Sequence, residues 1–311
     1  MNAKPSSAAT TGNPTHYDRY PSRCFSTPRH QPRQDPVLHV GPGAAGPLSA
    51  EELAQFEREG FLLCPEVFTR GEIHALRAAM DQAARQDAER IAEPDSTEVR
   101  SLFALHRGDH LPARLMRDPR LVHRAEQLLG PGVYIHQSRA NRKPAFDGRE
   151  FWWHSDFETW HVEDGLPAMR ALSAMVFLDD NTAANGPLLV IPGSHHIFIA
   201  CVGATPENHH AHSLRRQEYG IPDRDSLTLL AHDRGVQALC GVAGTVALFE
   251  CNLLHGSAGN LSPLPRLNLF AVYNHIDNAP AAPFGGRPPR PLHVAERTAV
   301  AITASPLDLC V

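Results

Sequence analysis

The fold class is decided by six short runs from residue 133 onward: VYIHQSR (133–139), EFWWHSD (150–156), RALSAMVFL (170–178), PLLVIP (187–192), TVALFE (245–250) and RLNLFAVYNHI (266–276). The runs are rich in β-branched and aromatic residues, which predicts strands. Turn-forming residues separate them, among them Asn185-Gly186-Pro187 and Pro192-Gly193. Many short strands behind a helical segment predict an all-β sandwich or barrel with helices packed on its outside.

The chain before these runs is expected to be an irregular arm followed by helices. Residues 1–47 are rich in Pro, Ser, Ala, Gly and Thr and lack periodicity. Helix starts follow at Ser49 with Glu52, at Thr69 with Glu72 and at Asp118-Pro119. We therefore expect a single domain over 48–311, with a helical part (48–130), a β core (about 131–280) and a Pro-rich tail.

Composition and charge argue against several classes of protein. The 311 residues carry 29 Lys and Arg against 34 Asp and Glu, a formal charge of −5. With no block of like charge, a surface for nucleic acid or anionic lipid is not expected. The longest stretch without charged residues, 181–206, contains prolines, and the N-terminus has no apolar signal segment. Six unpaired cysteines favour a reduced, cytoplasmic protein.

Histidine is abundant, and His-x-acid pairs could hold a metal, because residues i and i+2 of a strand point to the same face. There are four such pairs, where about two are expected by chance: His16 and Asp18, His154 and Asp156, His161 and Glu163, and His275 and Asp277. His154 and Asp156 lie in FWWHSDFETWH, whose aromatic residues could wall a dry cavity. An aromatic strand with a buried, hydrogen-bonded histidine is the alternative.

A facial triad of two histidines and one carboxylate needs a third ligand from elsewhere and leaves open positions for substrate and oxygen. The best candidate is His255, which follows the strand TVALFE. Arg266 comes eleven residues later, at the start of the next expected strand. A buried guanidinium could bind the distal carboxylate of a 2-oxo dicarboxylate that chelates the metal. Taken singly, a packing histidine and a surface arginine remain open for these two residues.

Taken together, these residues and their neighbours resemble a known family. HSD, HGS and an Arg eleven residues after the distal His are similar to the phytanoyl-CoA dioxygenase branch of the Fe(II)/2-oxoglutarate oxygenases. The segment FWWHSDFETWHVEDGLPAMRALS (151–173) most specifically resembles the ectoine hydroxylases within that branch. Six further segments resemble them as well: DRYPSR (18–23), HQSRANRKP (136–144), NGPLLVIPGSH (185–195), CVGATPENH (201–209), RRQEYGIPD (215–223) and ECNLLHGSAGNLSPLPRLNLFAVYN (250–274). The resemblance runs from about Asp18 to Phe284. Leu166, where Met is usual, and the tail after Phe284 depart from it.

The resemblance implies a mainly β fold with flanking helices and a double-stranded β-helix (jelly-roll, cupin-like) core. It implies Fe(II) on His154, Asp156 and His255, with 2-oxoglutarate and O2 as cosubstrates. Further positions match as follows: Lys143, Ser257, Arg266 and Asn268 around 2-oxoglutarate, and Gln137, Trp160 and Phe249 around ectoine. The implied reaction is hydroxylation of ectoine at ring carbon 5, with release of succinate and CO2, in a homodimer. Halogenating relatives carry a small residue in place of Asp156, so an aspartate here favours hydroxylation.

Other functions remain open at this point. A related oxygenase could act on another small molecule. Gln137, Trp160 and Phe249 discriminate between the two, because a different substrate would need different side chains around it. A catalytically silent jelly-roll could bind a metal or a small ligand. A hydrolytic zinc enzyme could also use two histidines and a carboxylate, although Arg266 has no obvious role in that chemistry.

Overall fold

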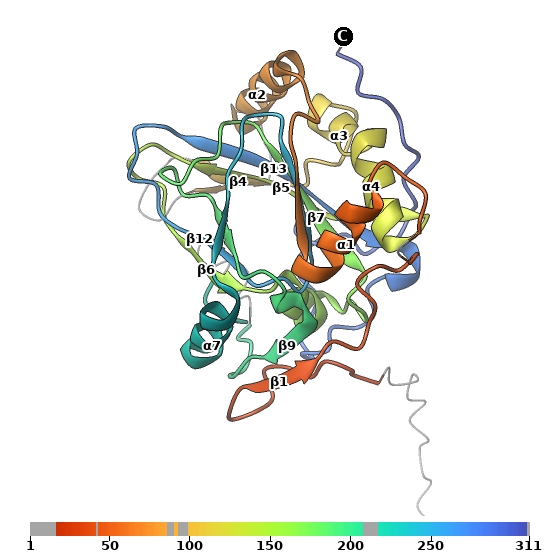
Figure 1. Ribbon diagram of the computed structural model, residues 1–311, viewed down its shortest axis with the longest axis vertical. Coiled ribbons are helices and arrows are strands. Elements are labelled where there is room, and N and C mark those ends of the chain that lie inside the picture. The colour runs from red at the N-terminus through yellow and green to blue at the C-terminus, as the bar shows by residue number, and fades with distance from the viewer. Residues whose placement is uncertain (1–16, 42, 86–89, 93–98, 208–216, 310–311) are drawn as a thin grey trace, which may run out of the picture.

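Two antiparallel sheets face each other in the computed structural model, which describes residues 17–41, 43–85, 90–92, 99–207 and 217–309 (Figure 1). The larger sheet has the order β2-β11-β7-β13-β5-β4-β3 and the smaller the order β10-β8-β12-β6. The strands are β2 (Phe61–Cys64), β3 (Arg90–Ala92), β4 (Val99–Phe103), β5 (Val133–Lys143), β6 (Phe151–His154), β7 (Ala171–Phe177), β8 (Leu188–Val190), β10 (Gln237–Leu239), β11 (Val246–Glu250), β12 (His255–Ser257) and β13 (Arg266–His275).

Strand β13 shows how the larger sheet is buried on both faces. All ten of its residues are buried. Leu267, Leu269 and Tyr273 belong to the apolar core shared with the helices, whereas Phe270 belongs to the core between the two sheets. Side chains alternate along a strand, so one face of β13 meets helices and the other meets the smaller sheet. This is the arrangement that the sequence predicts for a helix-covered β core.

The helices are α1 (Ala50–Glu59), α2 (Arg70–Arg85), α3 (Leu111–Leu115), α4 (Pro119–Leu129), α5 (Asp156–Thr159), η1 (Trp160–Asp164), η2 (Ser194–His196), α7 (Arg224–Arg234) and η3 (Ile276–Asn278). Three of them, α1, α2 and α4, begin where the sequence predicts. Ser49 and Glu52 form both hydrogen bonds of a capping box, and Asp118 caps α4. Helices α1, α2 and α4 contribute to the core that covers the larger sheet, and Figure 1 shows them along that side.

Part of the expected irregular arm is built into the fold. Strand β1 (Arg29–Pro32) pairs with β9 (Ile197–Ala200). Arg33 Nη1 lies 2.8 Å from Glu250 Oε1 in a buried ion pair at the end of β11. Residues 1–16, His16 included, lie outside the described residues. Sequence periodicity could not reveal β1, because its exposed residues show no apolar alternation.

The expectation of a strand through EFWWHSD is wrong at its end. Strand β6 stops at His154, Ser155 caps the following helix, and Asp156 is the first residue of α5. The polar SD pair is therefore a helix start, since serine is a favoured N-cap and an acid is favoured in the first turn. The two side chains still converge, but through this turn and not through strand alternation.

A buried histidine gives the protein a predictable acid sensitivity. His195 is fully buried against Gly60, where a Cβ would lie 2.5 Å from its Nδ1. Burial, with His196 and Arg33 nearby, lowers the pKa of His195 to about 3. Below pH 6.5 the unfolded chain therefore binds a proton that the folded chain does not, and this group lowers the free energy of unfolding by about 2 kcal/mol at pH 5.

We expect His195→Gln to reduce the loss of stability between pH 7.5 and pH 5, measured by urea unfolding of the metal-free protein. The absolute stability of the variant is not the readout, because the substitution also changes packing. His232→Gln, which alters a largely exposed histidine on α7, is the matched control. An equal pH dependence in wild type and His195→Gln would contradict the prediction.

Candidate metal centre and binding pocket

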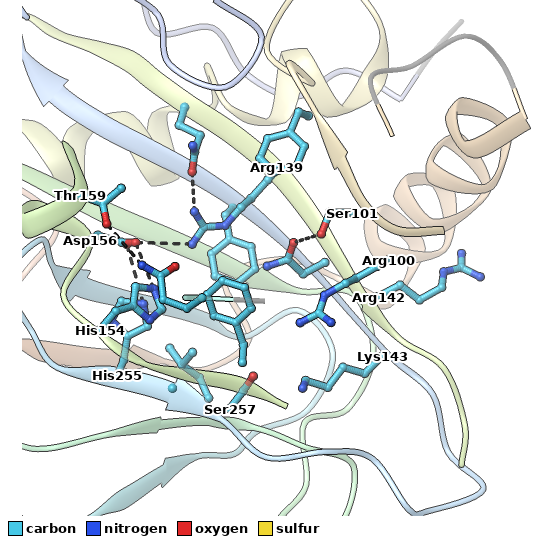
Figure 2. Close-up of a pocket in the computed structure, with 18 of the residues that line it drawn as sticks. Arg100, Ser101, Arg139, Arg142, Lys143, His154, Asp156, Thr159, His255 and Ser257 are labelled. Atoms are coloured by element: carbon cyan, nitrogen blue, oxygen red, sulfur yellow. Dashed lines mark hydrogen bonds and ion pairs between the residues drawn. The ribbon is translucent and has the colours of Figure 1, made fainter. Parts of the chain in front are cut away.

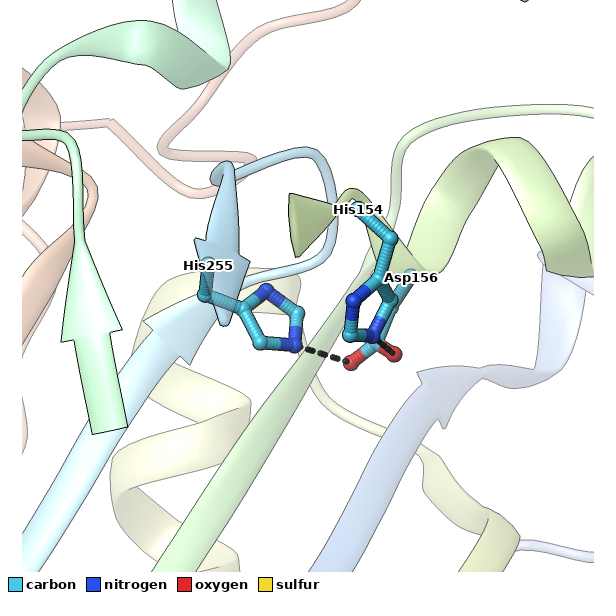
Figure 3. Close-up of side chains that lie close together, drawn as sticks. All are labelled: His154, Asp156 and His255. Carbon is cyan, nitrogen blue, oxygen red and sulfur yellow. Dashed lines mark ion pairs between the residues drawn. The ribbon is translucent and has the colours of Figure 1, made fainter. Parts of the chain in front are cut away.

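Two imidazoles and one carboxylate meet between the sheets. His154 ends β6 and His255 begins β12, and the two residues are paired directly across these strands. Their ring centroids lie 4.2 Å apart, and Asp156 reaches them from the start of α5 (Figure 3). One ligand atom from each of the three residues lies within 4.8 Å of the others, and all three residues are buried. Among the described residues, this is the group of His, Cys, Asp and Glu side chains that could hold a metal ion.

Backbone carbonyls fix the tautomer of both histidines. His154 Nδ1 lies 2.8 Å from the carbonyl oxygen of Trp152, and His255 Nδ1 lies 2.9 Å from that of Leu253. A carbonyl only accepts hydrogen bonds, so each Nδ1 carries the proton and each Nε2 keeps its lone pair. The Nε2 atoms face Asp156 at 3.6 Å and 3.9 Å. Such carbonyl partners are typical of metal-binding histidines.

The charge states at this cluster suit a divalent cation. Burial alone would raise the pKa of Asp156, but His255, Arg139 and His154 outweigh it and hold the pKa below its usual value. Burial, with His154 as a neighbour, lowers the pKa of His255 to about 3. An ionised carboxylate beside a neutral imidazole is the state that binds a metal.

A pocket opens from this cluster toward a cationic end (Figure 2). Figure 2 shows His154, Asp156 and His255 at one side, Arg100 and Lys143 at the other, and Ser257 between them. Aromatic and aliphatic side chains line the space as well: Phe103, Phe151, Trp160, Leu188 and Phe270. The pocket thus offers an apolar wall with charged groups at its two ends, which is the usual form of a small-molecule site.

Arg266 lines the cationic end and carries a donor without a partner. The side chain is buried, and no described residue accepts a hydrogen bond from its Nε. Burial, with Arg100 nearby, lowers the pKa of Arg266 to about 10, so it remains charged at neutral pH. With its amide in the orientation that satisfies its neighbours, Asn268 accepts from Arg266 Nη1 at 2.7 Å. A buried guanidinium with an unused donor fits an incoming carboxylate.

The other predicted site residues take different positions. Lys143, Ser257, Gln137 and Trp160 line the pocket. Asn268 is buried behind Arg266 and does not line it. Phe249 is fully buried with its ring 5.1 Å from that of His255, so it backs the metal cluster instead of facing the cavity.

Arg139 is a pocket residue that sequence reasoning missed. It lies on β5 beside Gln137, with Nη2 at 3.9 Å from Asp156 Oδ1 and the guanidinium 4.8 Å from the Phe270 ring centroid. Its Nε is buried and has no partner among the described residues. The signal was available, since Gln137, Arg139 and Lys143 occupy alternate positions of one strand and so share a face.

A second group of missed residues comes from distant segments. Arg290, from the Pro-rich tail, lines the pocket and pairs with Asp164 at 2.5 Å. Glu163 and Gln217 also line it. No local pattern marks Arg290, because its partner lies 126 residues earlier in the chain.

Comparison with known proteins places the chain in a family. The family model described as phytanoyl-CoA dioxygenase (PhyH) matches residues 56–268. An ectoine dioxygenase of Bordetella parapertussis is 50% identical over 296 residues, covering 94% of this chain and 96% of its own. One of Sphingopyxis alaskensis is 50% identical over 285 residues, covering 90% and 93%. The crystal structure of EctD from S. alaskensis with 2-oxoglutarate and 5-hydroxyectoine has a TM-score of 0.85 at 45% identity, covering 94% and 100%.

Fold, site and comparisons together define a jelly-roll dioxygenase. The chain belongs to the phytanoyl-CoA dioxygenase family, and its relatives within that family are ectoine dioxygenases. The fold class, the family and the enzyme class predicted from the sequence are confirmed. In the part of the chain that is described, no helix is long and apolar enough to cross a membrane.

Proposed function

We propose that the protein hydroxylates ectoine at ring carbon 5, using Fe(II), 2-oxoglutarate and O2. One oxygen atom enters 5-hydroxyectoine, the other enters succinate, and CO2 leaves. The observation that carries the proposal is the pairing of a two-histidine, one-carboxylate cluster with a buried guanidinium, that of Arg266, whose Nε has no partner among the described residues. High identity to ectoine dioxygenases over nearly the whole chain supports it.

We assign the iron to His154, Asp156 and His255. Bound there, iron would supply the centre at which O2 is activated. The protein contributes two fixed lone pairs and one negative charge, and three protein ligands leave positions for the cosubstrate and oxygen. Arg139 offsets the charge of Asp156 from 3.9 Å. Its unpartnered Nε gives a carboxylate bound near the metal a hydrogen-bond donor.

We assign the cationic end of the pocket to the distal carboxylate of 2-oxoglutarate. Arg266 offers its free Nε, and Asn268 holds the guanidinium in place by accepting from Nη1. Lys143 donates to the carbonyl oxygen of Ala258 at 2.7 Å, which fixes a second positive charge at this end. Ser257 places a hydroxyl between the two ends of the pocket (Figure 2). The cosubstrate is thereby oriented with its oxo acid end toward the metal cluster.

We assign the aromatic side of the pocket to ectoine. Ectoine carries a delocalised amidinium, and the face of Trp160 can attract such a cation. Gln137 donates to the carbonyl oxygen of Val294 at 2.7 Å and accepts from Arg139, so it links the substrate side to the C-terminal tail. Phe249 packs on the His255 ring, and we propose that it shapes the metal side of the ectoine site.

One incubation tests the proposal. Purified protein, Fe(II), ascorbate, 2-oxoglutarate and ectoine are mixed in air, and succinate and 5-hydroxyectoine are quantified together. Equal amounts of both products are expected. Slow succinate release that is independent of ectoine would move the substrate elsewhere within the oxygenases. Neither product, with iron shown to be bound, would support a silent binding protein.

Trp160→Leu tests the substrate side separately. Loss of a cation–π contact of about 0.5–2 kcal/mol should raise the KM for ectoine about 2- to 30-fold, with the KM for 2-oxoglutarate unchanged. Steady-state kinetics with each substrate varied in turn gives both constants. Trp153→Leu, which alters an aromatic residue outside the pocket lining, is the matched control. Parallel shifts in both constants for Trp160→Leu would argue against its role in ectoine binding.

Three further expectations concern the oligomeric state, the cellular location and the extent of the domain. We propose a homodimer, to be tested by light scattering after size-exclusion chromatography. We propose a cytoplasmic protein, supported by the five described cysteines, all of which are free thiols. We propose that the expected domain over 48–311, together with the preceding segment that pairs with it through β1, folds as a single catalytic domain, which predicts a single unfolding transition for the metal-free protein.

A further inference from the structure

A buried arginine from the N-terminal segment joins two acids on either side of Trp160. Arg23 donates to Glu158 through Nε at 3.0 Å and through Nη2 at 2.7 Å. Its Nη1 donates to Glu163 at 2.6 Å and to Thr205 at 2.7 Å. The arginine and both acids are buried. All three nitrogens of one guanidinium thus donate hydrogen bonds to residues 158–163, the stretch that carries Thr159 and Trp160 into the pocket.

The stretch that Arg23 holds has an uncommon backbone. After the single turn of α5, residues 160–164 form a π-helix, and Gly165 N–H donates to the Trp160 carbonyl at 2.9 Å, five residues back. π-helical turns are rare and occur frequently at functional sites. A turn of this kind depends on its surroundings, because its hydrogen bonds alone do not favour it over an α-helix.

Several segments converge on the same contact. Ser22 Oγ donates to Glu158 at 2.6 Å, and the Cys201 N–H donates to Ser22 Oγ at 2.9 Å. Arg23 itself has φ of 57°, a left-handed conformation that is uncommon for a residue with a side chain. At Gly220, a Cβ would lie 2.3 Å from Glu158 and 2.5 Å from Arg23. The left-handed backbone of Arg23 and the close approach of Gly220 thus accompany the burial of these ion pairs.

The metal end of α5 is held by other contacts. Phe157 N–H donates to the Cys251 carbonyl at 2.8 Å, and Ser155 caps the helix. Asp156 is therefore anchored on the side of β6 and β11, whereas Glu158 and Glu163 anchor the turn that presents Trp160. Loss of the arginine should release the second part of this stretch while the first part stays in place.

We propose that Arg23 is a positioning residue, which sets the ectoine side of the pocket by clamping Glu158 and Glu163 around Trp160. The inference rests on the proposed ectoine hydroxylation for its kinetic consequences only. Without the guanidinium, two buried carboxylates would face each other with reduced compensation, and this turn would rearrange or hydrate. Lysine cannot replace the arginine fully, because one ammonium lacks the planar fork that reaches both acids.

Kinetics separates positioning from general stability. Arg23→Gln should lower kcat/KM for ectoine about 10- to 100-fold, the loss expected when a binding group moves by about 1 Å. The KM for 2-oxoglutarate should change less than twofold, and succinate should form in excess over 5-hydroxyectoine. Arg23→Lys should fall between wild type and Arg23→Gln. Arg19→Gln, which breaks a partly exposed ion pair with Asp35 in the same segment, should match wild type.

Fluorescence tests the same inference without any substrate. In a Trp152→Phe, Trp153→Phe background, Trp160 is the remaining tryptophan. Adding Arg23→Gln should shift its emission to longer wavelength, because the buried indole gains water, and Arg19→Gln should not. Unchanged emission together with an unchanged ectoine KM would overturn the inference, and so would an equal rise of both KM values. If wild type fails to hydroxylate ectoine, the proposed function fails, while the emission shift still decides whether Arg23 positions Trp160.

Discussion

Asp156→Asn is expected to lower hydroxylation by more than about 100-fold, since the loss of even an outer-shell partner of a metal ligand costs 10- to 100-fold. The amide keeps the shape of the carboxylate but removes the only negative charge of the cluster. The two imidazoles would then have to hold a divalent cation with Arg139 beside them. Iron retained after gel filtration and 5-hydroxyectoine formed per hour are the two measurements.

The chain offers a matched control for this change. His275 and Asp277 repeat the His-x-Asp pattern, but Asp277 is largely exposed and no third ligand lies nearby among the described residues. Asp277→Asn should leave iron binding and turnover unchanged. Asp156→Ala is the harsher version, because it removes the side-chain atoms beside Arg139 as well as the charge, and the cavity left behind should lower the melting temperature. Wild-type turnover in Asp156→Asn would remove Asp156 from the metal site.

Arg266→Gln is expected to raise the KM for 2-oxoglutarate about 10- to 150-fold, which corresponds to a charged hydrogen bond of about 1.5–3 kcal/mol. The Nε of Arg266 has no partner within the described chain, so the substitution removes a contact that only the cosubstrate makes. The ectoine KM should change little when 2-oxoglutarate is saturating, because the two ligands occupy different ends of the pocket. Initial rates over a wide range of 2-oxoglutarate concentrations measure the effect.

Arg142→Gln distinguishes a specific contact from general electrostatics. Arg142 belongs to the neighbouring strand β5 and pairs with Asp81 on α2 at 2.6 Å. Figure 2 shows its side chain leading away from the metal cluster. The substitution Arg142→Gln removes the same charge from the same end of the molecule. Its effect on the 2-oxoglutarate KM should stay below about twofold, because exposed ion pairs contribute little. Equal effects of the two substitutions would contradict the assignment of Arg266.

Two arginines of the pocket each keep one nitrogen available for an anion. Arg266 and Arg139 both keep a buried Nε donor unused, one at the cationic end and one beside Asp156. An unused buried donor costs free energy in the ligand-free protein. That cost is offset when a carboxylate arrives, so the pocket favours anionic ligands over neutral ones of the same size.

Much of the fold could be predicted from the sequence, because its signals are local. The capping residues Ser49, Thr69 and Asp118 act on backbone groups within one helical turn, so short sequence windows were enough to find them. The six apolar runs became β5, β6, β7, β8, β11 and β13 for the same reason. The missed strands are β1, β2, β3, β4, β9, β10 and β12, because segments of three to five residues are too short to show a period of their own. Strands β6 and β8 are as short, but they lie within the longer apolar runs 150–156 and 187–192.

The residues of the candidate site likewise fall into those that local sequence signals identify and those that only the folded chain brings together. By itself, the sequence determined six strands of the core, the starts of α1, α2 and α4, and the candidate set of His154, Asp156, His255 and Arg266, through local propensity and a long signature. Only the tertiary structure decided that Asp156 starts a helix, that Arg139 faces the metal cluster and that Arg23 bridges two acids 135 and 140 residues away. Local propensity acts over a few neighbouring residues, whereas such contacts exist only after the chain has closed on itself and removed these charges from water.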